Sequence, residues 1–415
     1  MKRVVILTGN HVCHNPRAFK EAEALCNAGF EVEWLGAWFD TDLAARDRSL
    51  LTNRRWTFRT VADWTRGTLL SMARRQQQRL RRWIGVKLHK LLGWENSWQL
   101  GYCTRELLRR ALQQNAALVI AHSEPALWVA EKLSQRGCRV GVDMEDWFSE
   151  DLLPEARKRR PLKLLRRLEK NLLKAARHRT CPSKSMSYAL AEAYQCEAPV
   201  VVYNAFPWSK RKTLDGKFKD RVNRAVLSLH WFSQTIAPGR GLEDLFAALP
   251  FVSSNCEIHL RGRISNQDQE WLDQIIPTAW MERVFVHPIV HNDELLSRIG
   301  EHDIGLALDP NKPASRNVTV TNKILQYLLA GLPVIASDTA GHREVSETAL
   351  NAIVLYQSGD AAALARRLDE LLSRGELRMQ MRTAALCAAE QNFCWEKISQ
   401  HLLKSVEDAL LTESS

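Results

Sequence analysis

The stretch TVTNKILQYLLAGLPVIASD, residues 319–338, carries the clearest structural signals in the chain. Thr321 is suited to cap the amino end of a helix. Gly331 supplies the left-handed residue that ends this helix, and Pro333 prevents its continuation. The next residues, VIAS, are apolar and typical of a buried strand. The sequence therefore predicts a short helix that leads directly into a strand.

The amino end of this helix is a candidate anion site. The backbone N–H groups of its first residues, Asn322 and Lys323, have no partner within the helix. Together with the helix dipole and the Lys323 ammonium, they favour a phosphate or diphosphate. A surface helix whose lysine faces water is the alternative, and the motif alone does not choose between the two.

Strand and helix patterns alternate in both halves of the chain. The predicted strands are RVVILT, FEVEWLG, LVIAHSE, RVGVDMED, RTCPS and PVVVYN in the first half, and AVLSLHW, CEIHLRG, VFVHPIV, DIGLAL, PVIAS and AIVLY in the second. Such alternation indicates parallel sheets covered by helices. The irregular, charged residues 206–224 separate the two series. We therefore expect an α/β protein with two Rossmann-like, doubly wound domains facing across a cleft, where such sheets bind ligands.

Composition excludes several protein classes. The chain has 415 residues, 45% hydrophobic and 25% charged, which suits a globular protein with a large interior. No apolar run reaches the roughly 18 residues of a membrane span, and MKRVVILTGN is too short for a signal peptide, so we expect a cytoplasmic protein. The nine cysteines lack CxxC pairs and clusters with histidine, so neither a zinc site nor a disulfide framework is indicated.

The net charge of +11 is concentrated in two segments of the first half. Residues 54–90 contain eleven basic residues against one acid, Asp63, and place Leu80, Trp83, Ile84, Leu88 and Leu91 on one helical face. Residues 157–179 form a second basic segment with an apolar stripe of Leu165, Leu168, Leu172 and Ala176. Such segments bind anionic membrane surfaces, and core helices with a solvated basic face are the alternative. Helix-turn-helix and zinc patterning are missing, so we expect no nucleic-acid partner.

Several segments resemble one enzyme family. The stretch NKILQYLLAGLPVIASDTAGHREV, residues 322–345, closely resembles the donor-nucleotide motif of the family 4 glycosyltransferases. Other segments resemble the same family in order and spacing, and they are HNPRAFKEAEALCNAGFEV, VDMEDWFSEDL, VVVYNAF, VLSLHWFSQTIAPGRGLEDLFAAL and the terminal helix beginning FCWEK. The resemblance covers almost the whole chain.

This resemblance implies a GT-B fold and a retaining transfer of sugar from a nucleotide-diphosphate donor, without metal or cofactor. The domains expected from it are 1–205, an acceptor domain with a basic amphipathic insert at 54–100; 206–390, a nucleotide-sugar domain; and 391–415, a helix that crosses back to the first domain.

The resemblance also implies roles for individual residues. Arg240 in PGRG stands where the family usually has lysine, and a guanidinium there can clamp phosphate. The residues expected to bind the donor nucleotide are Gln234, Arg240, Gly241, Arg261, Thr321, Asn322, Lys323 and Gln326. Asn15 and Arg17 match the first-domain loop that faces the cleft. The candidate catalytic residues are His122, Glu145, Asp146 and Glu344, with loop or helix-capping carboxylates and a structural histidine as the alternatives.

Two positions depart from the family pattern. The family has a pair of glutamates where this sequence has Val318 and Gln326. Gln326 can still form hydrogen bonds to ribose hydroxyls, but no carboxylate at either position can stabilise positive charge on the sugar. Asp143, Glu145, Asp146 or Glu344 could supply that charge instead.

The sequence thus predicts a retaining, metal-independent glycosyltransferase that acts on a glycan or lipid-linked glycan, in bacterial surface-polysaccharide assembly, peripheral to the inner face of the cell membrane. A catalytically inactive nucleotide-sugar-binding or scaffold protein is the alternative.

Overall fold

The computed structural model describes residues 2–152, 154–158, 160–221 and 223–411. The chain divides into two compact units. The first contains residues 1–182, 186–202 and 399–415, and the second contains residues 183–185 and 203–398. Positions 412–415 of the predicted terminal helix lie outside the described residues.

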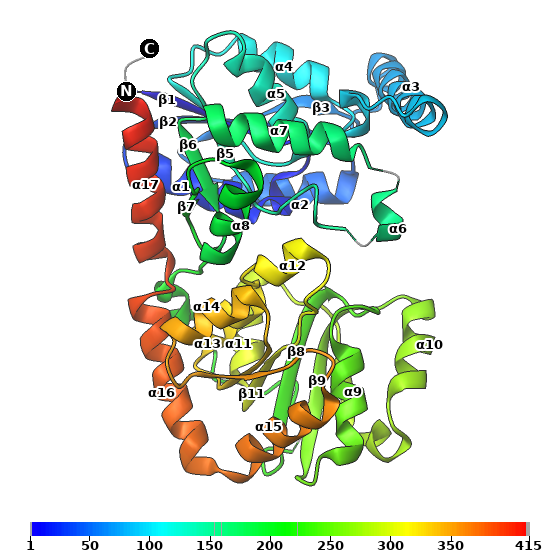
Figure 1. Ribbon diagram of the computed structural model, residues 1–415, viewed down its shortest axis with the longest axis vertical. Coiled ribbons are helices and arrows are strands. Elements are labelled where there is room, and N and C mark those ends of the chain that lie inside the picture. The colour runs from blue at the N-terminus through cyan, green and yellow to red at the C-terminus, as the bar shows by residue number, and fades with distance from the viewer. Residues whose placement is uncertain (1, 153, 159, 222, 412–415) are drawn as a thin grey trace. The chain divides into compact units, whose positions relative to one another are not determined.

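The first unit is built on a parallel sheet with the order β3-β2-β1-β4-β5-β6-β7 (Figure 1). Its strands are β1 (Arg3–Leu7), β2 (Glu31–Trp38), β3 (Thr57–Asp63), β4 (Leu118–Ala121), β5 (Val140–Asp143), β6 (His178–Cys181) and β7 (Val200–Val201). Its helices are α1 (Pro16–Asn27), α2 (Thr41–Leu51), α3 (Leu69–Leu92), α4 (Thr104–Leu112), α5 (Glu124–Ser134), α6 (Pro154–Arg157), α7 (Leu162–Ala175) and α8 (Lys184–Tyr194), with short 3-10 turns at Val12–His14 and Ser97–Gln99. The first two residues of α8, Lys184 and Ser185, belong to the second unit.

The second unit has a parallel sheet with the order β10-β9-β8-β11-β12-β13. Its strands are β8 (Leu227–Thr235), β9 (Cys256–Arg263), β10 (Val284–His287), β11 (Ile304–Ala307), β12 (Val334–Ser337) and β13 (Ile353–Tyr356). Its helices are α9 (Leu242–Ala248), α10 (Asn266–Ile275), α11 (Asn292–Gly300), α12 (Ala314–Val318), α13 (Asn322–Ala330), α14 (Ala340–Thr348), α15 (Ala361–Ser373) and α16 (Gly375–Gln391), and 3-10 turns occur at Trp208–Thr213, Leu249–Phe251 and Thr278–Arg283.

The central strands of both sheets are mostly apolar and buried because helices cover both faces of a parallel sheet. All four residues of β4, β11 and β12 are buried. The helix α17 (Trp395–Leu411) contributes Val406, Ala409 and Leu410 to the core around β1 and β2, so the end of the chain completes the first unit (Figure 1). No helix in the described ranges is long and apolar enough to span a bilayer.

The signals in residues 319–338 correspond to the observed elements. The helix α13 begins at Asn322 with Thr321 as its N-cap residue, and it ends at Gly331, which has a φ of 79°. β12 follows at Val334. Local chemistry determines these boundaries, since the left-handed glycine and Pro333 both stop the helix.

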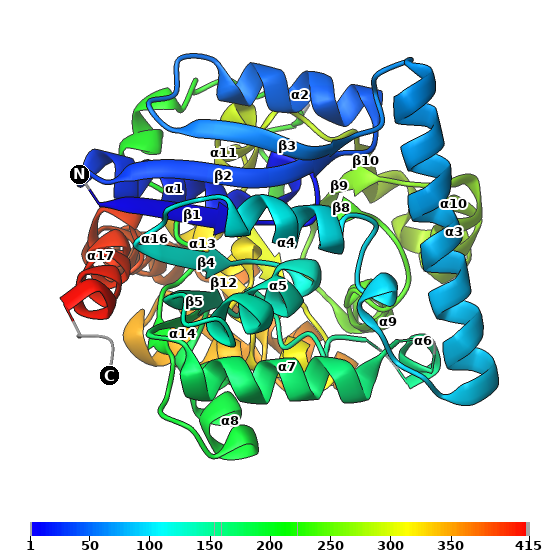
Figure 2. The ribbon, with the colours of Figure 1, turned by 90° about the horizontal axis from the view of Figure 1, so that it is seen from above.

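The structure differs from the prediction in one part of each basic segment. Residues 57–63, within the predicted insert, form the edge strand β3, whereas residues 69–92 form the expected long helix α3 (Figure 2). In the second segment, Leu165, Leu168 and Leu172 of α7 are almost fully buried. The apolar stripe of α7 is therefore part of the core and does not face a membrane.

Four histidines pack together inside the second unit. His230 and His302 stack with ring centroids 4.5 Å apart, and His259 and His287 stack at 5.2 Å. Burial lowers the pKa of His259 to about 3, and burial also lowers the pKa of His230, His287 and His302. The imidazoles are therefore neutral in the folded protein at neutral pH.

This cluster predicts a loss of stability in acid. A histidine whose pKa is lowered on folding takes up protons preferentially in the unfolded chain, so the free energy of unfolding decreases as the pH falls below the unfolded value of 6.5, until the folded pKa near 3 is reached for His259. We expect urea midpoints at pH 7.5, 6.0 and 5.0 to fall less steeply for His259→Gln than for the wild type. His291→Gln is the control, because the side chain of His291 is 75% exposed. Equal slopes for all three proteins would contradict the prediction.

A second prediction concerns two glycines in the loop between β8 and α9. Gly239 and Gly241 both have a positive φ, of 73° and 86°. A Cβ atom on Gly241 would lie 1.7 Å from the carbonyl oxygen of Leu308, whereas one on Gly239 would meet nothing within 4 Å.

Gly239→Ala should therefore cost about 1 kcal/mol of stability, from the left-handed conformation alone. Gly241→Ala should cost at least about 3 kcal/mol, because the backbone must also move. Urea unfolding checks the difference, and similar losses for the two variants would show that the close approach to Leu308 is not a constraint.

Candidate functional site

The first candidate region lies where the strand order of the second sheet reverses. β8 and β11 are neighbours there, and the chain continues outward from them in opposite directions. Open α/β sheets bind ligands at the carboxyl ends of such strands. The loops that follow β8 and β11 are residues 236–241 and 308–313, and Gly241 brings them into contact at Leu308.

Lys323 lies at this position, in the first turn of α13. Its Nζ atom is 2.8 Å from Oδ1 of Asp309, which belongs to the loop after β11, and 5.7 Å from the centre of the Trp231 ring. Burial opposes the charge of Asp309, but the Lys323 ammonium holds the pKa of that carboxyl below its ordinary value. Oδ2 of Asp309 is buried and has no hydrogen-bond partner among the described residues. Lys323 is therefore fixed across the amino end of α13, beside a carboxylate that retains a free oxygen.

Thr321 lies at the same place, which we call the α13 corner and which consists of residues 236–241, residues 308–313 and the first turn of α13. The side chain of Thr321 forms no capping hydrogen bond to the helix. Its hydroxyl is 3.2 Å from Nε2 of His342. Burial lowers the pKa of His342, and the Nδ1 atom of this neutral ring lies 3.0 Å from the carbonyl oxygen of Ser337. Nδ1 therefore carries the proton and donates to Ser337, so that Nε2 accepts from Thr321.

Two arginines add positive charge. Arg240 donates from Nη1 to the hydroxyl of Ser233 at 3.0 Å, and Arg316 donates from Nη1 to the carbonyl of Gly239 at 2.7 Å. The charge of Arg316 also acts on the Asp309 carboxyl. In the ranges that the structure describes, neither arginine has a recorded acidic partner. Three cations, Arg240, Arg316 and Lys323, thus lie around this corner. Of these, Lys323 has a recorded carboxylate partner, Asp309.

The remaining predicted donor residues occupy different environments. Oε1 of Gln326 is buried and lacks a hydrogen-bond partner within the described part of the chain. Gln234 is exposed on β8. Arg261 is buried, forms an ion pair with Asp220 and donates to the carbonyl of Pro288. These partners of Arg261 do not belong to the two loops at the tip of α13.

The second candidate region is a charged cluster at the carboxyl ends of β4 and β5 in the first unit. Arg17 donates from Nε and Nη2 to the two oxygens of Asp143, at 2.8 and 2.7 Å, and from Nη1 to the carbonyl of Val202. Burial opposes the charge of both groups, but each stabilises the other, so the pKa of Asp143 is lowered and the pKa of Arg17 is raised. This pair therefore ties α1 to the end of β5.

His122 is enclosed by carboxylates. Its Nε2 atom is 2.5 Å from Glu21, and its Nδ1 atom is 2.9 Å from Glu145 and 3.3 Å from Asp143. Burial opposes the charge, yet these carboxylates hold the pKa of His122 well above its ordinary value. Both ring nitrogens of the imidazolium donate, so neither is free to accept a proton. His122 positions Glu145 and the loop after β5 in the structure.

Asp146 lies beside this cluster. Burial and the charges of Asp151 and Glu145 raise the pKa of Asp146 to about 8. The carboxyl is therefore mostly protonated at neutral pH, and its catalytic role stays a prediction. A protonated carboxyl in such surroundings can donate a proton or a hydrogen bond.

Among the residues that the structure describes, this cluster also contains a group that could hold a cation. His122, Asp143 and Glu145 offer ligand atoms that lie within 4.8 Å of one another. Arg17 already binds both oxygens of Asp143, and His122 binds Glu145. A metal ion would therefore have to displace existing charge-assisted hydrogen bonds.

Asn15 and Glu344 have structural contacts. Asn15 is buried, and its side-chain amide donates to Oδ1 of Asn10 and to the carbonyl of His11. Glu344 accepts from the backbone N–H groups of Lys184 and Ser185, at 2.9 and 2.7 Å, and from the Ser185 hydroxyl at 2.6 Å. These are the contacts of a helix-capping carboxylate, and its catalytic role stays a prediction.

The structure also adds residues that the sequence did not indicate. Asp309, Arg316 and Ser233 surround the predicted Lys323 and Arg240. Asp309 directly follows an apolar strand pattern, which is the one signal that could have identified it. In the first unit, Ser123 has a φ of 70° and accepts from the N–H of Gly9, so a strained residue joins the ends of β1 and β4.

The sequence of the second unit matches a known family. Residues 229–374 match the model of the family described as Glycosyl transferases group 1. The chain is also 32% identical over 82 residues to spore coat protein SA of Bacillus subtilis strain 168. That match covers 20% of this chain and 22% of the curated relative.

Solved structures resemble the chain along its whole length. Sucrose-phosphate synthase from Thermosynechococcus elongatus has a TM-score of 0.69 at 14% identity and covers 98% of both chains. HepE from Anabaena in complex with UDP has a TM-score of 0.69 at 16% identity, covering 98% of this chain and 100% of that one. TarM from S. aureus, solved with UDP and other ligands, has a TM-score of 0.67 at 8% identity and covers 99% and 100%. The chain therefore has the GT-B fold, with two Rossmann-like units of parallel strands, and its second unit carries the group 1 glycosyl transferase signature.

Proposed function

We propose that the protein is a glycosyltransferase that moves a sugar from a nucleotide-diphosphate sugar to a glycan or lipid-linked glycan acceptor. One observation carries this proposal. The segment that matches the group 1 glycosyl transferases, residues 229–374, includes Arg240, Arg316 and Lys323, and these cations gather at the carboxyl ends of β8 and β11.

This corner has the chemistry that a diphosphate requires. The amino end of α13 offers free N–H donors and the positive end of its dipole, and guanidinium groups bind phosphate oxygens through paired donors. A diphosphate would compete with Asp309 for Lys323, while Arg240 and Arg316 have donors beyond their single recorded hydrogen bonds. The unpaired oxygen of Gln326 can accept from a ribose hydroxyl.

The same groups support departure of the nucleotide. Negative charge develops on the diphosphate as the bond to the sugar breaks, and fixed cations with a helix end stabilise that charge. This assignment gives the chain's own residues the role that a divalent ion has in some transferases. Metal independence and retention of configuration are parts of the proposal, and they rest on the resemblance to family 4 enzymes.

The acceptor and the location are proposed from the charge of the first unit and from the resemblance. Surface-polysaccharide assembly at the inner face of a bacterial membrane agrees with the basic helix α3 and with the lipid-linked acceptor that the sequence suggests. Structures of fold neighbours were solved with UDP and UDP-glucose, which makes uridine nucleotides the first donors to examine.

An inactive nucleotide-sugar-binding or scaffold protein is the second candidate. Val318 and Gln326 favour it, because the family's glutamates are replaced there. It shares the nucleotide site with the first candidate and differs only in turnover.

Nucleotide binding should depend on the cations of the second unit. Lys323→Ala and Arg240→Ala should each weaken UDP binding by about 1.5–3 kcal/mol, because each removes charge-assisted hydrogen bonds to the diphosphate. Isothermal titration with UDP measures the loss. Lys212→Ala, at an exposed lysine outside the two loops, should bind as the wild type does. Unchanged affinity in both site variants would mean that the diphosphate binds elsewhere.

Turnover distinguishes an enzyme from a scaffold. We expect the protein to release nucleotide from at least one sugar donor in a panel of UDP, GDP, ADP, CMP and dTDP sugars, and release should increase when the acceptor is supplied. Nucleotide binding without release from any donor, with polyprenyl-linked glycans present, would favour the inactive protein. Thermal-shift screening against the five nucleotides would first identify the base.

A further inference from the structure

The carboxylates that the sequence suggested for the transferred sugar have partners or are neutral in the structure. Those with recorded hydrogen-bond partners are Asp143, Glu145 and Glu344. Burial and acidic neighbours raise the pKa of Asp146 to about 8. Val318 and Gln326 carry no charge. The negative charge that a sugar needs as its bond breaks therefore calls for another carboxylate.

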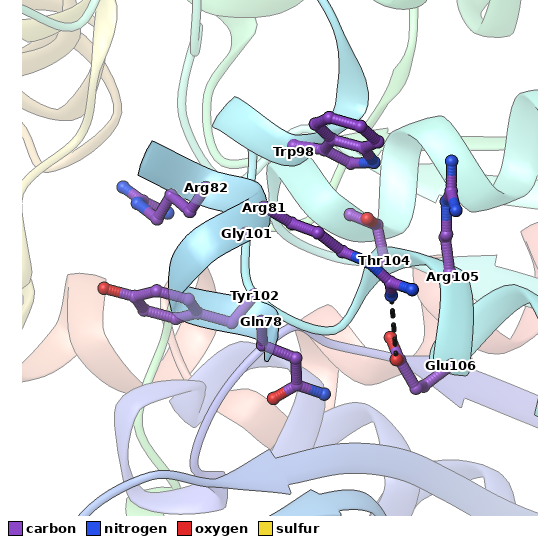
Figure 3. A pocket seen from close by; sticks show the side chains of 9 residues that line it. All are labelled: Gln78, Arg81, Arg82, Trp98, Gly101, Tyr102, Thr104, Arg105 and Glu106. Carbon is purple, nitrogen blue, oxygen red and sulfur yellow. Dashed lines mark ion pairs between the residues drawn. The ribbon is translucent and has the colours of Figure 1, made fainter. Parts of the chain in front are cut away.

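A small pocket of the first unit contains an acidic residue that is also paired (Figure 3). The pocket lies beside α3, and its Glu106 carboxylate is 3.6 Å from Arg81. Figure 3 shows the guanidinium groups of Arg82 and Arg105 on opposite sides of the pocket, pointing away from one another. The charged groups of this pocket therefore do not converge on one ligand.

Asp309 differs from these residues because it lies among the cations of the α13 corner. It follows β11, and its Oδ1 atom accepts from Nζ of Lys323 at 2.8 Å. The same nitrogen is 5.7 Å from the centre of the Trp231 ring. The side chains of Asp309 and Lys323 are 15% and 11% exposed. The ion pair is therefore largely withdrawn from water, yet each partner keeps some accessible surface.

The second oxygen of Asp309 has no donor. In the described part of the chain, Oδ2 forms no hydrogen bond. The Nε2 atom of His342 is 3.8 Å away, but this nitrogen accepts from Thr321, and the ring proton lies on Nδ1, which donates to Ser337. A buried carboxylate oxygen without a donor is unfavourable. The α13 corner is therefore suited to a ligand that brings a hydroxyl or N–H group.

Lys323 places Asp309 beside the phosphate that this lysine is proposed to bind. An ammonium has three N–H donors, so its bond to Asp309 leaves donors for a phosphate oxygen. Gln326, which is proposed to bind ribose, lies three residues further along α13 and on the same side as Lys323. The other end of the diphosphate, which carries the sugar, then lies toward the amino end of the helix. The hydroxyls of the sugar come next to Asp309 in this arrangement.

We propose that Asp309 is the carboxylate that faces the transferred sugar, where it accepts a hydrogen bond from a hydroxyl or N–H group and stabilises positive charge at the anomeric carbon. This assignment rests on the proposed transferase function. The bond from that carbon to the phosphate oxygen breaks, and its electron pair goes to the phosphate oxygen. The acceptor oxygen forms the new bond, and its proton passes to the departing phosphate.

Asp309 forms no covalent bond in this reaction and stays ionised. Burial opposes its charge, but the ammonium of Lys323 stabilises it. A fixed carboxylate of this kind stabilises charge that develops as the sugar leaves, and it needs no reorganisation at that moment. One loop residue thus supplies the negative charge that Val318 and Gln326 cannot supply.

The proposal predicts opposite effects on a nucleotide with and without its sugar. Asp309 repels the diphosphate, whereas it accepts a hydrogen bond from an attached sugar. Asp309→Asn in the full-length protein should therefore tighten UDP binding about threefold. The preference for UDP-glucose over UDP should fall about tenfold. Isothermal titration with both ligands measures the ratio, and the nucleotide and nucleotide sugar selected by the donor panel replace them if the base or sugar differs.

Turnover gives a second measurement. Asp309→Asn should lower the rate of nucleotide release about a hundredfold, because the developing positive charge loses its counter-ion. Asp309→Ala should change binding and turnover in the same directions, which excludes an effect of the new amide. Asp215→Asn is the control, because it removes a carboxylate 2.6 Å from Arg298, a buried cation of the same unit, and it should bind and react as the wild type does. Thermal unfolding is measured for every variant.

The outcomes distinguish this assignment from the function on which it rests. Weaker UDP binding by both Asp309 variants would show that Asp309 only orients Lys323, and an unchanged preference for UDP-glucose would show that it does not contact the sugar. Either result overturns the proposal. If the wild type binds both ligands without turnover, the binding ratio still decides the contact. If Lys323→Ala leaves UDP affinity unchanged, the nucleotide site itself is wrong, and the assignment of Asp309 fails with it.

Discussion

The close approach of Gly241 to Leu308 is the constraint on which the cationic site at the tip of α13, proposed to bind the nucleotide, depends. The loops after β8 and β11 can meet only because no side chain stands between the backbone of Gly241 and the Leu308 carbonyl. This contact places the Arg240 loop beside the loop that carries Asp309, and Asp309 in turn holds Lys323. The parallel sheet provides the location, because the chain leaves β8 and β11 toward opposite edges of the sheet and the loops after them lie next to each other. Gly241 allows these two loops to come into contact.

The first unit uses charge in a different way. Arg17 and the protonated His122 pair with three carboxylates, those of Glu21, Asp143 and Glu145, so that α1, β4 and β5 are joined by charge-assisted hydrogen bonds. Such a buried network fixes geometry more than it adds stability, because each group loses its hydration. The loop after β5 is consequently held in place, and Asp146 on that loop keeps its proton near neutral pH because of burial and its acidic neighbours, which raise its pKa to about 8.

The basic residues of the first half serve two structural purposes. In α7 they form the solvated side of a helix whose leucines complete the core. In α3 most of the large apolar side chains are exposed, whereas Gln78 and Gly85 are buried. Two segments of similar composition therefore differ in which side packs against the protein, and only the tertiary contacts show this difference.

The sequence by itself determined the elements whose signals are local. The cap at Thr321, the stop at Gly331 and Pro333, and the alternation of buried strands with helices follow from backbone chemistry and periodicity within short stretches. The sequence missed β3, because an edge strand has weak alternation and lay within a basic segment. It also could not show that Arg261 pairs with Asp220, that Glu344 caps Lys184 and Ser185, or that His122 has no free nitrogen. These facts depend on partners far away in the chain, and a side chain's chemistry is decided by the charges and burial that folding brings to it.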